Sequence, residues 1–150
     1  DNNLVSLIKD NIKLINELDN KIIIDFKTSK SDILLNSDSE QLSRVFFNLI
    51  KNSIESIQDK KIDDVNLIGK IDISLNENVE KINFIIIDNG IGFGIFADNI
   101  KDILNPYFTT KKKGTGLGLS IVNKIINDHN GKINFVSLDN GAKIEIMFTK

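Results

Sequence analysis

Apolar residues recur along this chain at two spacings, one typical of helices and the other of strands. Residues 1–20 carry them at near-helical intervals, which predicts an amphipathic helix with one apolar face. The short, β-branched run 22–26 predicts a strand, and residues 33–35 predict a second, shorter strand. The chain is therefore expected to begin with a helix that is followed by extended segments.

A long helix is predicted next. Asp38 and Ser39 favour the N-cap position, and the apolar spacing beyond them predicts a helix that ends near Gln58. The segment 58–69 is polar and charged, so we expect it to be a loop.

The second half of the chain predicts two pairs of strands with one helix between them. The run 84–87 is apolar on both faces, which is typical of a central strand. Asn140-Gly141 lies between two alternating runs and predicts a hairpin, Gly131 suits the end of a helix, and 89–113 is expected to be irregular. The predicted strands are 71–75, 82–87, 133–138 and 143–149, and the predicted helix is 118–128. The elements add up to an α/β two-layer sandwich, with a mixed sheet and helices packed on one face.

Composition narrows the class of protein without naming it. The chain has 150 residues, of which 41% are hydrophobic and 27% charged, as is usual for one soluble domain. The net charge of −2 argues against a general binder of nucleic acid or anionic membranes. Without cysteine, the chain has no disulfide, thiolate metal site or cysteine nucleophile. Because it opens at Asp1, we expect it to be part of a longer protein.

The long predicted helix carries a polar stripe opposite its apolar side, formed by Arg44, Asn48, Asn52, Glu55 and Asp59. One interpretation is a solvated helix face. The other is a metal site, because Asn48 and Asn52 lie one turn apart and can direct their amide oxygens at one point. Mg²⁺ prefers oxygen ligands and usually keeps waters and substrate phosphates in its shell. Spacing alone leaves both interpretations open.

An aspartate directly follows the predicted central strand, in the stretch Asp88-Asn89-Gly90-Ile91-Gly92-Phe93. A carboxylate at a strand end can accept a hydrogen bond from an exocyclic amine, and the glycines allow a flat ring to approach the backbone. The alternative is a tight turn capped by the aspartate.

Three glycines alternate with other residues in Gly114-Thr115-Gly116-Leu117-Gly118, between a lysine run and the predicted helix 118–128. Amides at a helix N-terminus carry partial positive charge and bind anions, and Lys111 lies in the run that adds counter-charge. The pattern favours phosphate binding over a flexible linker. It lacks the Gly-Lys-Ser/Thr end of a Walker loop, and no strand directly precedes it as in a dinucleotide fingerprint.

Four stretches together resemble the ATP-binding catalytic domain of sensor histidine kinases, in the superfamily shared with gyrase, MutL and the heat-shock chaperones. They resemble the N box at 48–53, the first glycine box at 88–93, the F box at 106–111 and the second glycine box at 114–119. The resemblance covers nearly the whole chain, and the run 106–131 is most similar to nitrogen-regulation kinases of the NtrY/NtrB type. It implies a Bergerat-type fold with a mixed, mostly antiparallel sheet.

The resemblance also implies a site for ATP and Mg²⁺ in one catalytic domain, 1–150, with a lid at about 93–115. Asn52, assisted by Asn48, would bind the metal, and Asp88 would accept the adenine amine. Main-chain amides of the second glycine box would bind the phosphates, and Lys111 would contact them from the lid. The implied ATP-binding positions are Asn48, Asn52, Asp88, Gly90, Gly92, Thr110, Lys111, Gly114, Thr115, Gly116, Leu117, Gly118 and Leu119.

The reaction implied is transfer of the γ-phosphoryl group of ATP to a histidine on a separate helical domain, and from there to an aspartate of a response regulator. That dimerisation and phosphoacceptor domain is expected upstream and absent here, so this domain alone should be a cytoplasmic monomer. Many kinases of this family are anchored in the inner membrane, and the resemblance extends this expectation to the parent protein.

Two departures from the family pattern bear on phosphate binding and lid closure. Glu55 and Ser56 stand where many members have a basic residue, and Gly94-Ile95-Phe96 stands where a proline is often found. The alternatives are another member of the superfamily, such as an anti-sigma-factor serine kinase or an ATPase, or a degenerate scaffold. Asn48 occupies the position of the water-orienting glutamate in the hydrolysing relatives, and an amide is a poor general base, which argues against the first two. The intact boxes argue against the scaffold.

The chain has one histidine, His129, at the predicted end of the helix 118–128. Its place in the family pattern is not that of the phosphoacceptor. We expect it instead to interact with the helix dipole at that C-terminus.

Overall fold

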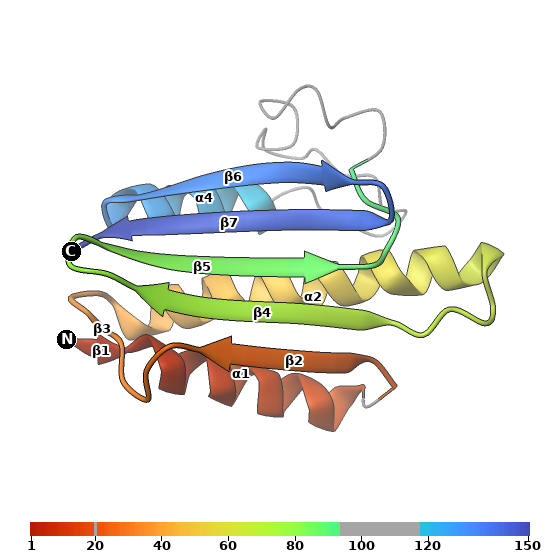
Figure 1. Cartoon of the computed structure of the whole chain (residues 1–150), viewed down its shortest axis with the longest axis horizontal. Helices are drawn as coiled ribbons and strands as arrows, with labels where there is room; N and C mark the ends of the chain where they lie inside the picture. Colours follow the sequence, from red (N-terminus) through yellow and green to blue (C-terminus); the bar gives the residue numbers. More distant parts are fainter. Residues whose placement is uncertain (20, 94–117) are drawn as a thin grey trace.

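The structure is a computed structural model that describes residues 1–19, 21–93 and 118–150. Its helices are α1 (Leu4–Leu18), α2 (Ser39–Asp63) and α4 (Gly118–Asp128). Its strands are β1 (Asn2–Asn3), β2 (Ile23–Thr28), β3 (Leu34–Leu35), β4 (Lys70–Glu77), β5 (Lys81–Asp88), β6 (Gly131–Leu138) and β7 (Gly141–Thr149). Five strands form one sheet in the order β2-β4-β5-β7-β6, and the helices form a second layer (Figure 1). The predicted two-layer α/β sandwich is confirmed.

The sheet is mixed and mostly antiparallel. Only β2 and β4 pair in parallel, with Ile23 opposite Lys70. The predicted hairpins β4–β5 and β6–β7 are both present, and β5 lies in the middle of the sheet as predicted. Along β5, Phe84 and Ile86 are buried against the helices while Ile85 and Ile87 stay half-exposed. The strand is thus apolar on both faces, but helices cover only one of them.

Helix α1 begins directly after its N-cap residue, Asn3. The Asn3 side chain accepts a hydrogen bond from the Val5 N–H at 3.1 Å, which satisfies one of the free donors at the helix start. Its apolar face buries Leu4, Ile8 and Ile15. Strand β1 pairs with β3 and leads directly into α1, so this short pair fixes the start of the helix.

Helix α2 starts as predicted but ends later. Asp38 caps it by accepting from the Gln41 N–H at 3.0 Å. The predicted loop at 58–69 is wrong in its first part, because the helix continues to Asp63, and its last turn extends past the start of β4 (Figure 1). Lys60 and Lys61 lie in that turn, where cations favour the negative end of the helix dipole. Because this end of α2 does not pack on the sheet, it has no apolar face by which the sequence could have shown it to be helical.

The core lies between α2 and the central strands. Phe46 of α2 and Phe84 of β5 are fully buried, with ring centroids 5.1 Å apart and planes tilted by 44°. Burying a side chain of this size stabilises a fold by about 1.5–3 kcal/mol. This contact sets the distance between α2 and β5, on which the candidate site depends.

The turn after α4 uses an asparagine where the sequence suggested a glycine. Asn130 adopts the left-handed conformation with φ 57°, and Gly131 is already the first residue of β6. Asparagine tolerates this conformation better than other residues with a side chain, because its short amide can bond locally.

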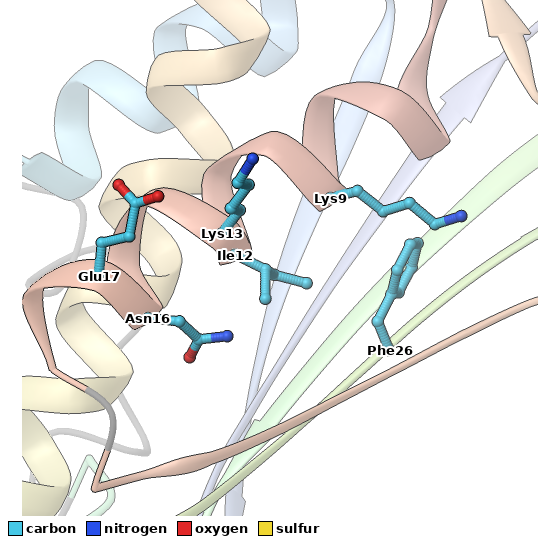
Figure 2. A pocket seen from close by; sticks show the side chains of 6 residues that line it. All are labelled: Lys9, Ile12, Lys13, Asn16, Glu17 and Phe26. Atoms are coloured by element: carbon cyan, nitrogen blue, oxygen red, sulfur yellow. The ribbon is translucent and has the colours of Figure 1, made fainter.

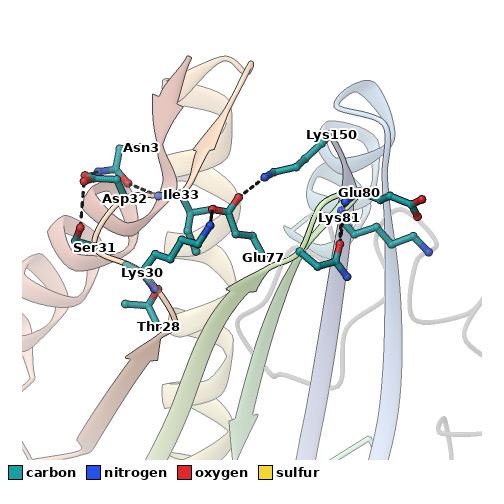
Figure 3. Close-up of polar contacts among 11 residues, drawn as sticks. Asn3, Thr28, Lys30, Ser31, Asp32, Ile33, Glu77, Glu80, Lys81 and Lys150 are labelled. Atoms are coloured by element: carbon teal, nitrogen blue, oxygen red, sulfur yellow. Dashed lines mark hydrogen bonds and ion pairs between the residues drawn. The ribbon is translucent and has the colours of Figure 1, made fainter.

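Glu77, at the end of β4, joins three distant segments of the chain. Its carboxylate pairs with Lys30 Nζ at 2.9 Å and with Lys150 Nζ near the C-terminus (Figure 3). The Glu77 side chain is only 8% exposed. The hydrogen bond from Lys150, and then that from Lys30, lowers the pKa of Glu77 below its ordinary value of 4.5.

Glu77→Gln should lower the thermal unfolding midpoint at neutral pH, because glutamine keeps the shape but loses both ion pairs. A lowered pKa means that the ionised carboxylate stabilises the fold above pH 4.5 and that this contribution is lost as the pH falls below that value. The difference between variant and wild type should therefore vanish in acid. Circular dichroism melts at pH 3 and pH 7 measure it. The exposed Glu80→Gln serves as control, and an equal effect in both variants would contradict the assignment.

Candidate nucleotide site

The predicted base-binding aspartate lies where β5 meets α2. Asp88 is the last residue of β5, and the next residue, Asn89, fastens the turn to the start of β4. The Asn89 side chain accepts from the Lys70 N–H and donates to the Ile68 carbonyl, both at 2.8 Å. The position of Asp88 is therefore fixed by the sheet on one side and by the following turn on the other.

The Asp88 carboxylate is buried and hydrogen-bonded. It is 7% exposed, its Oδ1 accepts from the Gly90 N–H at 2.9 Å, and the Ser53 side chain of α2 bonds to it as well. Burial raises the pKa of Asp88 above its ordinary value of 3.8, and the bonds from Gly90 and Ser53 and the charge of Lys60 oppose this shift. Such a group favours a ligand that brings a hydrogen-bond donor, since a donor stabilises the charged form.

The turn after Asp88 packs directly on α2. The Ile91 N–H donates to Ser56 Oγ at 3.0 Å and to the Ser56 carbonyl oxygen at 3.3 Å. A Cβ atom on Gly90 would lie 2.2 Å from Ser56 Oγ and 2.6 Å from the Ser56 carbonyl carbon. The turn can approach α2 this closely only because residue 90 is a glycine.

Gly92 meets a second steric limit. Its φ is +73°, a conformation that side chains disfavour, and a Cβ there would lie 2.8 Å from the carbonyl oxygen of Gly141. The next residue, Phe93, stacks edge-to-face on Phe135 of β6, with centroids 5.6 Å apart. The first glycine box is thus held between α2 and the β6–β7 hairpin.

The predicted metal ligands lie on α2 beside this turn. Asn48 and Asn52 are both half-buried and one turn apart, and Asn52 directly precedes the serine that contacts Asp88. Within the described part of the chain, no group of three or more histidine, cysteine or carboxylate side chains could hold a metal ion. Neutral amide oxygens fit a metal that takes most of its charge compensation from phosphates and waters, as Mg²⁺ does.

The start of α4 comes level with these amides. Helices α2 and α4 pack together and run antiparallel (Figure 1). At the far end, the Asp38 N–H donates to His129 Nε2 at 3.0 Å. A helix rises about 1.5 Å per residue, so Gly118 lies roughly 16 Å along α2 from that contact, close to the level of Asn48. Gly118 and Leu119 are the described residues of the second glycine box.

Several predicted positions lie outside the described residues. They are most of the lid, from 94 onward, and Thr110, Lys111, Gly114, Thr115, Gly116 and Leu117. The described site residues thus lie on α2 or on elements packed against it, and the binding roles of all these positions stay predictions.

His129 has the helix-end role that the sequence suggested. Its Nδ1 lies 2.7 Å from the Ile125 carbonyl oxygen at the end of α4, while its Nε2 accepts from the Asp38 N–H. These partners assign the neutral ring with the proton on Nδ1. Both ring nitrogens are engaged, so neither is available as a nucleophile.

A groove at the other edge of the sheet is separate from this site. It lies between α1 and β2, has a volume of about 480 Å³, and is open to one side (Figure 2). Its lining residues are Lys9, Ile12, Lys13, Asn16, Glu17 and Phe26, none of which belongs to the predicted site.

No helix of the described residues is long and apolar enough to span a membrane.

Sequence reasoning missed the contacts that hold the aspartate, namely those of Ser53, Ser56 and Asn89. One signal was available. Leu49, Ser53 and Ile57 form one row along α2 at intervals of four, so Ser53 places a hydroxyl in an otherwise apolar row. A buried hydroxyl requires a partner, and the nearest uncommitted polar group at the end of the central strand was Asp88.

Comparison with known proteins shows the family of this chain. Residues 37–150 match the family described as histidine kinase-, DNA gyrase B-, and HSP90-like ATPase, and the chain belongs to this family. It is 37% identical over 132 residues to sporulation kinase A of Bacillus subtilis, covering 87% of this chain and 20% of that protein. It is 32% identical to the sensor histidine kinase ZraS of Escherichia coli O157:H7, covering 95% of this chain and 30% of that protein. A Rickettsia prowazekii protein named "NtrY-like" is 33% identical over 97% of this chain and 23% of its own length.

The fold matches solved catalytic domains. The catalytic domain of histidine kinase ThkA superposes with a TM-score of 0.83 at 31% identity, covering 99% of this chain and 93% of that one. A structure of ThkA in complex with the response regulator protein TrrA matches with a TM-score of 0.78 at 29% identity, covering 99% of this chain and 41% of that one. The chain thus spans 20% to 30% of its full-length relatives named here and nearly all of an isolated catalytic domain.

Gly90→Ala should destabilise the fold and weaken nucleotide binding, because the added methyl group meets the backbone of Ser56. Forcing an extra carbon into a packed site costs about 1–3 kcal/mol. Denaturant unfolding and calorimetric titration with ADP measure the two effects.

Gly118→Ala is the matched control, since a Cβ there meets no described atom within 4 Å. Its unfolding midpoint should equal or exceed that of wild type. If Gly90→Ala were as stable as this control, the close contact between the turn and α2 would be disproved.

Proposed function

We propose that this chain is the ATP-binding catalytic domain of a two-component sensor histidine kinase. It would hold Mg-ATP for transfer of the γ-phosphoryl group to a histidine on a separate helical domain of the parent protein. The observation that carries the proposal is the buried carboxylate of Asp88, which is held by α2 beside two amides suited to Mg²⁺. The family, the named kinases and the ThkA catalytic domain support it.

Adenine recognition would rest on Asp88. Two donors, the Gly90 N–H and the Ser53 hydroxyl, leave the carboxylate with lone pairs to accept the exocyclic amine of adenine. A guanine or hypoxanthine ring presents a carbonyl at that place and would meet the carboxylate with two acceptors opposed. Gly90 and Gly92 would leave room for the ring plane to lie against the backbone.

Metal and phosphate binding would fall to α2 and the start of α4. Asn52, assisted by Asn48, would hold Mg²⁺, which when bound neutralises charge on the phosphates. The main-chain amides of Gly116, Leu117, Gly118 and Leu119, with Gly114, Thr115, Thr110 and Lys111, would surround the phosphate groups. Residue 55 is a glutamate, so it lacks the positive charge that many family members place one turn after the metal-binding asparagine. Its Oε1 lies 3.9 Å from Lys51 Nζ on the same helix.

The chain's own residues would position ATP without attacking it. An imidazole nitrogen of the incoming histidine would form the new bond to the γ-phosphorus, the bond to the β,γ-bridging oxygen would break, and ADP would leave. Asn48 cannot act as a general base toward water, so hydrolysis should be slow and ATP should persist until the histidine arrives. An aspartate of a response regulator would then receive the phosphoryl group, and the ThkA complex with TrrA supports a partner of that class.

Asp88→Asn should raise the dissociation constant for Mg-ADP at least ten- to hundredfold, since a hydrogen bond to a charged group contributes about 1.5–3 kcal/mol. Calorimetric titration measures this. Normal affinity in the variant would mean that adenine recognition lies elsewhere.

The same variant should fold at least as well as wild type at pH 7. Because the pKa of Asp88 is raised above 3.8, its neutral form stabilises the fold below that pH, and the contribution is lost as the pH rises through the raised value. Asparagine stays neutral throughout, so its relative advantage in thermal midpoint should be largest at pH 7 and should shrink at pH 4. An advantage that grows in acid would contradict the direction of the shift.

The isolated chain should not phosphorylate itself. His129 is its only histidine, and both ring nitrogens are engaged. Incubation with γ-labelled ATP and analysis on an alkaline gel should give no acid-labile label. Label that is present on wild type and missing from His129→Gln would overturn this assignment.

A further inference from the structure

We infer that Ser53 is a positioning residue for nucleobase selection, whose hydroxyl holds the Asp88 carboxylate in the orientation that accepts an exocyclic amine. The inference rests on the proposed function, because it gives Ser53 a role through Asp88 rather than through contact with the nucleotide. It concerns the discrimination between purines with and without that amine.

Ser53 lies in a place where packing alone calls for an apolar side chain. Its row on α2 continues with Leu49 on one side and Ile57 on the other, both fully buried, and Ser53 itself is 3% exposed. A hydroxyl in such a row is costly unless it is hydrogen-bonded. The partner that the structure gives it is the Asp88 carboxylate.

The hydroxyl restricts a motion that the rest of the turn leaves open. Ser56 and Asn89 hold the backbone on either side of Gly90 through hydrogen bonds to main-chain groups. The last torsion of an aspartate side chain is broad and nearly two-fold. One donor, the Gly90 N–H, comes from the turn, and a second, Ser53, comes from the helix, so together they fix the carboxylate relative to two different elements.

A fixed acceptor discriminates more sharply than a mobile one. A site built to bond a substrate N–H rejects analogues without it, because its buried polar group is then left without a partner. If the carboxylate could turn aside, it would lose part of its bond to the amine and also relieve part of its conflict with a carbonyl. Loss of the Ser53 hydroxyl should therefore weaken amine-bearing nucleotides more than others.

The test compares dissociation constants of Mg-ADP and Mg-inosine diphosphate by calorimetry for wild type and Ser53→Ala. The second ligand carries a carbonyl in place of the amine. Ser53→Ala should raise the dissociation constant for ADP about three- to tenfold and leave that for inosine diphosphate within about twofold, so the ratio of the inosine diphosphate constant to the ADP constant falls. Ser43→Ala is the matched control, because Ser43 lies on the same helix and bonds Asn11 instead. Its ratio should equal that of wild type.

Two further variants keep the test decisive if alanine disturbs folding. Ser53→Cys keeps the volume with a much weaker donor and should also lower the ratio, while Ser53→Thr keeps the hydroxyl and should preserve the ratio even if its thermal midpoint drops. An unchanged ratio in Ser53→Ala and Ser53→Cys, or an equal loss for both ligands, would overturn the inference. Failure of the proposed function is recognised separately, since wild type itself would then bind no ADP.

Discussion

A carboxylate buried at the end of the central strand is the constraint on which the rest of this structure depends. Desolvation raises the pKa of Asp88, so the fold by itself would be more stable with this group neutral. Donors from the following turn and from α2 reduce that penalty without removing it. The remaining unfavourable energy is what a donor on the ligand can relieve. Carboxylates whose pKa is shifted by burial are characteristic of functional sites.

Holding such a group requires that several elements meet within a short distance. The Phe46–Phe84 contact brings α2 onto β5, Gly90 allows the turn to touch Ser56, and the Asn89 side chain ties the same turn to β4. Helix α2 is common to most of these contacts, and it also carries Asn48 and Asn52. The helix therefore acts as a frame that fixes the Asp88 turn and the two amides relative to each other.

The fold could be predicted from the sequence because its strands and helices bury apolar residues at their characteristic spacings. The errors fall where burial gives no signal. Helix α2 continues past Gln58 to Asp63 on capping and helix propensity alone, and Asn130 rather than Gly131 takes the left-handed turn. The candidate site is a prediction from motifs, in which Asp88, Asn48 and Asn52 stand, and the structure places Asp88 against the helix that carries both amides. The contact between Ser56 and Ile91 could not be predicted, because these residues are 35 positions apart and the packing of α2 on the sheet brings them together.

The distribution of chemical groups in this chain separates holding a nucleotide from reacting with it. Asp88 and the α2 amides are suited to recognition, whereas the residue in the place of a water-orienting glutamate is Asn48, which takes no proton near neutrality. The single histidine uses one ring nitrogen on the end of α4 and the other on the start of α2, so its bonds stabilise the helix layer. A bound triphosphate would meet neither a base nor a nucleophile among these residues. Under the proposed function, the reaction would wait for a group from another domain, so the timing of phosphoryl transfer would depend on contact between domains.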